Sequence, residues 1–410
     1  MQRDTGEDGG VPGPSPSLWT IMIALLAAHL AGMGAFLTVP VLAPAMAGET
    51  GVPASLAGFH TALVYLGALF SGPFTGPLIR RWGGVRMLQV CMVAVGVGIA
   101  IAALGHPVAL VVSALVAGLG HGPLTPGGSH LIAAHTPPRR RALVFSLKQA
   151  GVPLGAMVVA ALAPAIALVA GWRASILCMA AIAFVVAVAI QPLRAGLDQG
   201  RDAPGGAGAG FGGLLRESAA SIAMLRRDRA LARLTVMSCG YGVAQFCFST
   251  FFVAYQVASL GVALGQAGLH LALAQAAGVV GRIGWALLAD RWGARIVLVA
   301  CGLGAGLAGG VLAFADAGWP ILVVTLAGMV MGATAIGWNG IMLAEAARLA
   351  PQGQVGAATS ALSFAFAVTM LVAPPAFSLL IAGTGGYQAG FLMCVAAVLA
   401  GAWAIYGARR

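Results

Sequence analysis

The sequence predicts an all-α integral membrane protein with twelve transmembrane helices in two six-helix halves. Three observations support this fold class: an apolar composition, long apolar segments at regular intervals, and arginines concentrated in alternate loops. Hydrophobic residues make up 60% of the 410 residues and charged residues 8%, whereas soluble domains average about 45–50% and about 25%. This composition excludes a disordered chain, argues against an ordinary soluble enzyme, and fits a protein whose solvent is a lipid bilayer.

Apolar segments long enough to cross a bilayer recur twelve times along the chain. A crossing needs about 20 residues at a rise of about 1.5 Å each. The expected spans are 18–46, 54–79, 86–104, 107–133, 142–170, 173–192, 231–259, 266–288, 295–314, 318–346, 355–382 and 387–407. The longest polar interruption separates the sixth span from the seventh, so the chain divides there into two halves.

The polar segments outside the spans complete the domain organisation. Residues 1–17 are rich in Gly and Pro and carry three acidic residues, which is unlike a signal peptide and typical of a flexible cytoplasmic tail. Within 193–230, the first part has the composition of a flexible linker, and 214–230 predict an amphipathic helix at the lipid headgroups. The two six-helix halves are then 18–192 and 231–410.

Basic residues are distributed asymmetrically between the two sides of the predicted bundle. Arginines cluster after the second, sixth, eighth and tenth spans, before the fifth and at the end of the chain, while loops on the other side hold only Arg173. Under the positive-inside rule, this pattern places both termini in the cytoplasm of a multi-pass protein of the cell inner membrane. Topology thereby explains the net charge of +11, and no nucleic-acid partner is expected.

Two similar stretches occupy equivalent places in the two halves: Gly76–Arg86 (GPLIRRWGGVR) and Ala286–Arg295 (ALLADRWGAR). Each closes the second span of its half and precedes the third, as parallel internal repeats require. In these loops the sequence resembles the major facilitator superfamily, whose signature here is G-x-L-a-D-R-x-G-x-x-R, and the resemblance extends over residues 18–407. It implies the major facilitator fold. The first copy departs by placing Arg80 at the Asp position, and the second by starting with Ala and closing one residue early.

In that superfamily the paired loops form a gate on the cytoplasmic side. An acidic side chain beside a helix N-terminus is stabilised by the helix dipole, and only the second copy keeps its acid. We therefore expect the gate to depend on the second copy, with its Asp latched to the arginines that open the fifth span. The expected gate residues are Asp290, Arg291, Arg81, Arg139, Arg140 and Arg141. The alternative is that these charges only set the topology.

Three ionisable residues within predicted spans are the strongest functional candidates, because charges at that depth are costly and usually functional. Lys148 lies seven residues after Arg141, about 10 Å into its helix, and Arg282 lies eight residues before Asp290, about 12 Å in from the same side. Glu345 is near a helix end, and we interpret it as a surface or interfacial group. The deep charges are thus cationic, and an anionic ligand would complete the site, because an arginine can bind a carboxylate with two hydrogen bonds. The alternatives are snorkelling of Lys148 to the headgroups and a purely structural Arg282.

The surroundings of these two cations resemble monocarboxylate and oxalate-type carriers. Residues 282–290 (RIGWALLAD) resemble the eighth helix of those carriers, where an Arg at this distance from the loop binds the substrate carboxylate. Residues 140–151 (RRALVFSLKQAG) resemble the fifth-helix pattern of monocarboxylate porters. The resemblance implies that these helices flank each other across the two halves, so Lys148 and Arg282 would face one seam, and an anion between them would favour closure. Gly278 stands where those porters often carry an Asp.

Further candidates lie on helices that line the cavity in that superfamily. Tyr241 and Gln245 recur at helical spacing on the seventh span, Trp338 and Asn339 lie in the tenth, and Tyr65 in the second is a minor candidate. Polar groups at lipid depth need partners and are expected to face inward. Aromatic packing and hydrogen bonding between helices are the alternatives for these residues.

The ion that drives transport is open between protons in symport and a counter-anion in exchange. His121, midway along the fourth span, is the candidate proton site because the unperturbed pKa of histidine lies near neutrality. The alternative is a structural histidine whose ring is satisfied by neighbouring groups.

These features predict a monomeric secondary active transporter that moves a small organic anion, with a monocarboxylate as the leading candidate, by alternating access. The sequence shows no nucleotide-binding loop, paired intramembrane carboxylates or metal-ligand spacing, so no enzyme activity, cofactor or metal site is expected. The alternative is a proton-coupled multidrug or other small-molecule exporter of the same fold. The fifth-helix pattern of such exporters, G-x-x-x-G-P-x-x-G-G, is matched only at Gly151 and Gly155, since Ala156 replaces the proline.

Overall fold

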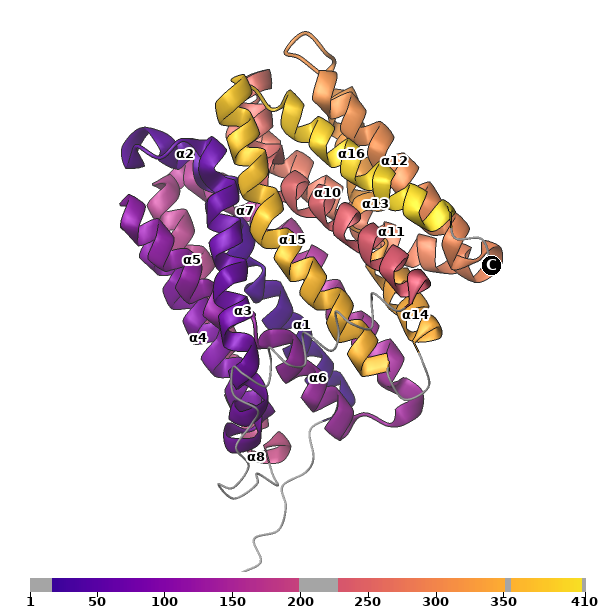
Figure 1. The fold of residues 1–410 in the computed structure, drawn as a ribbon. Helices are drawn as coiled ribbons and strands as arrows, with labels where there is room; N and C mark the ends of the chain where they lie inside the picture. The colour runs from indigo at the N-terminus through magenta and orange to yellow at the C-terminus, as the bar shows by residue number, and fades with distance from the viewer. Residues whose placement is uncertain (1–16, 199–227, 351–354, 408–410) are drawn as a thin grey trace, which may run out of the picture.

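The computed structural model describes residues 17–198, 228–350 and 355–407. These residues form a bundle of long α-helices, and no strand occurs among them (Figure 1). Eleven segments in this part of the chain are long and apolar enough to cross a membrane. Nearly all of the predicted tail 1–17, and most of the predicted linker with its amphipathic helix, fall outside the described residues.

The two halves of the chain contribute similar sets of helices. In the N-terminal half these are α1 (Leu18–Gly32), α2 (Gly34–Thr50), the short 3-10 helix η1 (Ala54–Leu56), α3 (Ala57–Trp82), α4 (Gly84–Ala102), α5 (Pro107–His121), α6 (Leu124–His135), α7 (Pro138–Ala189), η2 (Gln191–Leu193) and α8 (Arg194–Leu197). In the C-terminal half they are α10 (Arg229–Leu260), α11 (Leu264–Trp292), α12 (Ala294–Phe314), α13 (Ile321–Ala335), α14 (Asn339–Leu349), α15 (Val355–Thr384) and α16 (Gln388–Tyr406).

Helix α7 contains two membrane crossings, which the sequence analysis treats as the fifth and sixth spans. Its backbone leaves helical geometry at Gly171, where φ is 83°. The Ser175 hydroxyl donates to the Ala163 carbonyl at 2.7 Å, although twelve residues of straight helix would separate these groups by about 18 Å. The chain therefore doubles back at Gly171, so that the eleven apolar segments make twelve crossings and the predicted number is confirmed.

Three predicted spans are each interrupted by a short break. The first is divided between α1 and α2 at Met33, the fourth between α5 and α6 at Gly122, and the tenth between α13 and α14 at Gly337. A break removes helical hydrogen bonds and leaves carbonyl oxygens that must find other donors at membrane depth. These carbonyl oxygens become acceptors for several of the candidate side chains described below.

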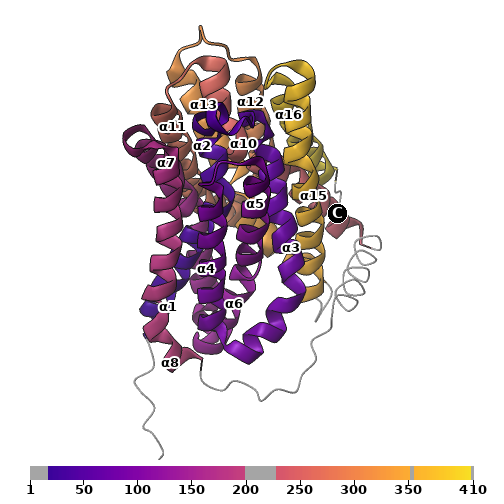
Figure 2. The same ribbon diagram turned by 90° about the vertical axis from the view of Figure 1, so that its left-hand side faces the viewer.

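The two halves lie side by side, as the change from indigo and magenta to orange and yellow shows in Figure 1, and the view in Figure 2 places the N-terminal helices in front. They meet where α7 packs on α11, α3 on α15, and α2 on α10. We call the end of the bundle where α1 begins and α16 ends the terminal end, and the opposite end the far end. Near the far end the backbones are very close, because a Cβ atom on Gly268 would lie 2.5 Å from the Ala160 carbonyl oxygen and one on Gly58 would collide with the Pro374 carbonyl oxygen.

The two loop motifs adopt the same turn at the terminal end. Gly83 ends α3 with φ of 89°, and Gly293 ends α11 with φ of 87°. This left-handed region favours glycine because a Cβ atom is strained there. The repeat seen in the sequence thus corresponds to a repeated backbone geometry.

Candidate functional site

Arg282 lies on α11 at the seam between the halves and is half-buried. Its Nη1 donates to the Gln149 carbonyl oxygen of α7 at 3.1 Å, and its Nε to the Ile336 carbonyl oxygen at 3.4 Å. The second acceptor belongs to the break between α13 and α14. Among the described residues, the ion pairs given by the structure do not include Arg282. The positive charge therefore rests on neutral carbonyl oxygens, and these two bonds use two of the five guanidinium N–H groups.

Two other predicted residues gather beside this guanidinium. Asn339 shares its acceptor, because the Asn339 amide also donates to the Ile336 carbonyl oxygen at 3.2 Å. The same amide donates to the Gln245 Oε1 atom of α10 at 3.2 Å. The structure thus brings Arg282, Asn339 and Gln245 together at the point where the tenth span is broken.

Tyr241 and Trp338 are near this group but direct their polar atoms to the backbone. The Tyr241 hydroxyl donates to the Leu298 carbonyl oxygen at 2.5 Å, and the Trp338 indole donates to the Ala335 carbonyl oxygen at 2.7 Å. The rings of the two residues meet edge to face at 5.6 Å, and both are fully buried. In this conformation they support the wall of the site, and both of their hydrogen-bond donors are used by backbone carbonyl oxygens.

A small cavity of about 30 Å³ lies between the halves, large enough for about two waters. Thr61 and Thr250 bridge the seam there, with their hydroxyl oxygens 3.2 Å apart, and Gln275 donates to the Ser249 hydroxyl at 3.2 Å. Thr61, Thr250 and Gln275 were not predicted from the sequence. Only Gln275 carried a signal, because it precedes Arg282 by seven residues and so shares its helix face.

Aromatic rings form a continuous row across the seam beside this cavity. Phe36 of α2 contacts His121 at 4.5 Å and Tyr65 at 4.8 Å between ring centroids. Tyr65 in turn contacts Phe246 of the other half at 5.3 Å. The row continues through Phe366 to Trp338. Tyr65 is therefore placed at the seam, within reach of both halves.

His121 closes the break in the first span. Its Nδ1 atom is 3.1 Å from the Gly32 carbonyl oxygen, the last residue of α1, so a proton on Nδ1 would be donated to that oxygen. The ring is half-buried. The structure thus gives His121 a structural contact, and its role as a proton site stays a prediction.

Lys148 points away from the seam into the N-terminal half. Its Nζ atom donates to the Thr125 carbonyl oxygen at 3.1 Å and to the Ser129 hydroxyl at 3.3 Å, both on α6, and only 2% of its surface is exposed. The helices approach here across Gly128, whose Cβ would lie 3.2 Å from the Lys148 side chain and 3.4 Å from His29. The next residue, Gln149, is the one whose carbonyl oxygen accepts from Arg282. Lys148 is therefore next in sequence to the residue that Arg282 binds, but the two cations have different partners.

The predicted gate residues are described only in part. Asp290, Arg291 and Arg81 are exposed at the terminal end. Glu345, at the same end, is paired with Arg348 at 2.5 Å. The side chains of Arg139, Arg140 and Arg141 lie outside the described residues, so the latch between them and Asp290 stays a prediction.

A buried acid that was not predicted from the sequence, Asp198, lies beside the first motif. Asp198 follows α8 and accepts hydrogen bonds from the backbone N–H groups of Val85 at 2.9 Å and Arg86 at 3.1 Å. These groups belong to the first turn of α4, where the helix dipole favours a negative charge. The carboxylate that caps this helix N-terminus therefore comes from the segment just after the sixth span.

Comparison with known proteins places this arrangement among membrane transporters. The family model described as Major Facilitator Superfamily matches residues 24–374. A mutant of the nucleoside transporter NupG is 13% identical, with 95% of this chain and 99% of that chain covered and a TM-score of 0.74. The peptide transporter POT in complex with sulfate is 16% identical, with 96% of each chain covered and a TM-score of 0.74.

A third solved structure is that of a bacterial homologue of the human lysosomal transporter Spinster in an inward-facing and occupied conformation. It is 13% identical, with 96% of this chain and 97% of that chain covered and a TM-score of 0.74. At these identities the similarity shows the fold alone. No curated protein matches the sequence.

Proposed function

Because the chain belongs to the Major Facilitator Superfamily, we propose that it is a secondary active transporter that carries a small organic anion, with a monocarboxylate as the first candidate. Movement would occur by alternating access, with the two halves rocking about the central cavity. We propose both termini in the cytoplasm of the inner membrane, which makes the far end the outer one. The tight glycine contacts near the far end would then close the outer entrance in this conformation.

The observation that carries this proposal is the bonding of Arg282. A guanidinium at lipid depth whose bonds reach only carbonyl oxygens, with no ion pair given among the described residues, retains its full charge. A carboxylate would bind it more strongly than these carbonyls, because it carries the opposite charge and can accept two parallel hydrogen bonds from the guanidinium. Asn339 and Gln245 could then orient the rest of the anion.

The same contact suggests how binding could be coupled to motion. Arg282 belongs to the C-terminal half, and the Gln149 carbonyl oxygen belongs to the N-terminal half, so their hydrogen bond ties α11 to α7. An anion that binds the guanidinium would break the hydrogen bond between Arg282 and the Gln149 carbonyl oxygen in the present conformation. In the alternative conformation the same anion would form new contacts between the two halves. A ligand shifts a conformational equilibrium only through such a difference. The 30 Å³ cavity has to widen before an anion can enter.

Uptake into proteoliposomes of radiolabelled short-chain monocarboxylates tests the proposal. Replacing Arg282 with Ala removes two hydrogen bonds to a charged ligand, each worth about 1.5–3 kcal/mol, and so is expected to lower uptake at limiting substrate by about 100-fold or more. Arg282→Lys retains the charge without the bidentate geometry and is expected to be intermediate. Arg348→Ala, which alters a surface arginine paired with Glu345, serves as the matched control. Wild-type uptake in Arg282→Ala, or no carboxylate uptake by the wild type, would refute the anion assignment.

The coupling ion is tested in the same vesicles. An imposed pH gradient drives uptake if protons are co-transported, and a preloaded carboxylate accelerates it if anions are exchanged. His121→Gln retains a donor for the Gly32 carbonyl oxygen but cannot titrate. Loss of pH-driven uptake with retained exchange in this variant would support His121 as the proton site.

A second candidate function is export of an uncharged, aromatic small molecule. The observation that favours it is the neutral lining of the cavity, where Gln245, Gln275 and the Phe246 ring meet hydroxyl groups and no charge. This candidate predicts transport that is insensitive to Arg282→Ala and sensitive to Gln275→Leu. The carboxylate proposal predicts a larger loss of transport in Arg282→Ala than in Gln275→Leu.

A further inference from the structure

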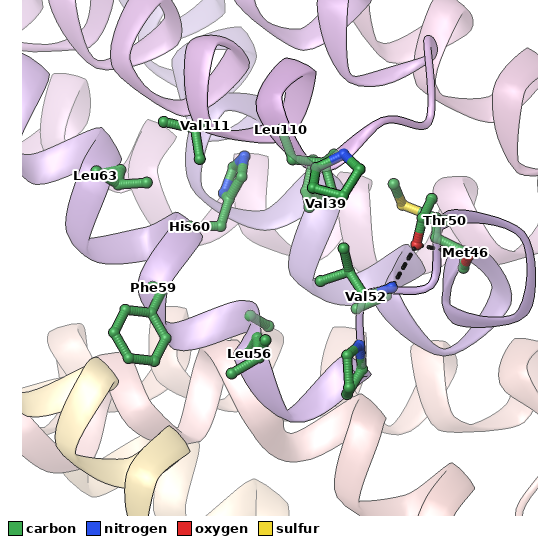
Figure 3. Close-up of a pocket in the computed structure, with 14 residues that line it drawn as sticks. Val39, Met46, Thr50, Val52, Leu56, Phe59, His60, Leu63, Leu110 and Val111 are labelled. Atoms are coloured by element: carbon green, nitrogen blue, oxygen red, sulfur yellow. Dashed lines mark hydrogen bonds between the residues drawn. The ribbon is translucent and has the colours of Figure 1, made fainter.

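A second cavity, of about 420 Å³, opens in the N-terminal half between α2, η1, α3 and α5 (Figure 3). Its size falls within the range of about 300–1,000 Å³ that is usual for small-molecule sites. It lies near the far end, and the helices that form it diverge above a tight contact. There a Cβ on Gly118 would collide with the Val64 carbonyl oxygen and one on Gly67 with the Leu115 carbonyl oxygen. The contact forms the floor of a wedge-shaped opening between α3 and α5.

The cavity faces the surroundings of the bundle. Leu56, Phe59 and Val111 line it and are 38%, 39% and 43% exposed. In a membrane protein such exposed apolar side chains contact lipid acyl chains. The remaining lining is almost entirely aliphatic, and its two polar side chains are those of Thr50 and His60.

Only one of these two polar side chains is available to a ligand. The Thr50 hydroxyl already donates to the Met46 carbonyl oxygen at 3.0 Å and accepts from the Val52 N–H at 3.2 Å. The His60 imidazole is 8% exposed, and neither of its nitrogens has a hydrogen-bond partner among the described residues. Figure 3 shows its ring extending from α3 toward Leu110 and Val111. A buried polar group without a partner is costly, so a ligand with a suitable polar atom is stabilised there.

The depth of His60 identifies the polar atom that could reach it. His60 lies three residues after Ala57, where α3 begins, and therefore about 5 Å below the far end of the helix. The interfacial layers that flank the hydrocarbon core are about 5–8 Å thick on each side. The ester carbonyls of membrane lipids lie close to this boundary, with their acyl chains directed inward.

We propose that this cavity binds one acyl chain of a membrane phospholipid, with the ester carbonyl oxygen accepting a hydrogen bond from the N–H of His60. The acyl chain fills the wedge between α3 and α5, and the headgroup stays at the surface. The site is separate from the seam between the halves, so the proposal does not depend on the identity of the transported substrate.

Photo-crosslinking in liposomes tests this site. The probe is phosphatidylethanolamine with a diazirine on one acyl chain, and its adducts are mapped by peptide mass spectrometry. Adducts are expected on the peptides that carry Leu63 and Leu110, above the level found on Leu303 and Leu307, which form an exposed apolar face of α12. His60→Leu is expected to lower the cavity adducts about three- to tenfold, the effect of one net hydrogen bond. His60→Gln, which keeps a donor, should restore part of the labelling.

Two further arms make the assignment specific. Val111→Trp fills the mouth of the cavity with an exposed substitution and should remove the cavity adducts while leaving those of α12 unchanged. A free fatty acid with the same diazirine chain tests the need for an ester. Equal labelling of the cavity and α12, unchanged labelling of the cavity in His60→Leu, or labelling by the free acid alone would overturn the proposal.

Discussion

The two halves join their helices differently at the same turn of the terminal end. In the N-terminal half, the acid Asp198, which follows the sixth span, caps the first turn of α4. In the C-terminal half, basic side chains instead contact the end of the last helix, α16. Arg295, in the first turn of α12, donates to the Tyr406 carbonyl oxygen, and Arg233 donates to the Gly407 carbonyl oxygen at 2.9 Å, both at the end of α16.

Both joints satisfy helix dipoles, although they use opposite charges. A carboxylate is favoured at a helix N-terminus and a guanidinium at a helix C-terminus. The N-terminal joint is buried, since Asp198 is 3% exposed, whereas Arg295 is exposed. A backbone repeat can therefore persist while its charges are exchanged, provided that each charge lies at the helix end that favours it.

The largest difference between the joints is expected for their glycines. A Cβ on Gly83 would collide with the Asp198 side chain, whereas nothing lies within 4 Å of a Cβ on Gly293. Gly83→Ala should therefore add overpacking to the strain of positive φ and destabilise the protein by about 3 kcal/mol or more. Gly293→Ala should cost about 1–2 kcal/mol from strain alone. Thermal unfolding in detergent measures both, and equal losses would show that the Asp198 contact does not shape this turn.

A smaller but still large effect is expected for Asp198 itself. Asp198→Ala leaves two backbone N–H groups of α4 without their charged acceptor, at a cost of about 2 kcal/mol or more. Asp198→Asn keeps one acceptor oxygen and should lose less. The same unfolding assay measures the difference, and an Ala variant as stable as the wild type would contradict the capping role.

The smallest effect is expected for the exposed joint. Arg295→Ala should cost about 0.3–1 kcal/mol, because a surface charge at a helix C-terminus is screened by water. Arg295→Lys should recover part of this loss. Raising the salt concentration should shrink the effect of Arg295→Ala and leave that of Asp198→Ala nearly unchanged. The reverse salt dependence would show that burial does not distinguish the two joints.

The sequence predicted the elements well because hydropathy and span length determine them locally. The twelve crossings follow from patterns within about 30 residues, and the two equivalent loops from a direct comparison of two short motifs. Asp198 could not be predicted, because its partners lie 112 and 113 residues away. Nothing in a polar linker indicates which acid will return to a helix end.

The direction in which Lys148 points differs from the sequence prediction. Counting residues predicts similar depths for Lys148 and Arg282. The resemblance to known carriers implies that the fifth and eighth spans are neighbours, and α7 does pack on α11. Successive residues of a helix point about 100° apart. That angle turns Lys148 toward α6 and leaves the Gln149 carbonyl oxygen for Arg282. Only the positions of the neighbouring helices determine such a direction.

The tie between the halves is anchored on main-chain oxygen, and this has a consequence for how it can be studied. Every amino acid placed at position 149 brings the same peptide carbonyl, so alanine scanning of α7 would leave the acceptor intact and record nothing there. The fifth helix is free to vary in side chain at this point over evolution while the joint persists. Only a substitution of Arg282, or a change to the backbone at position 149, would test this hydrogen bond.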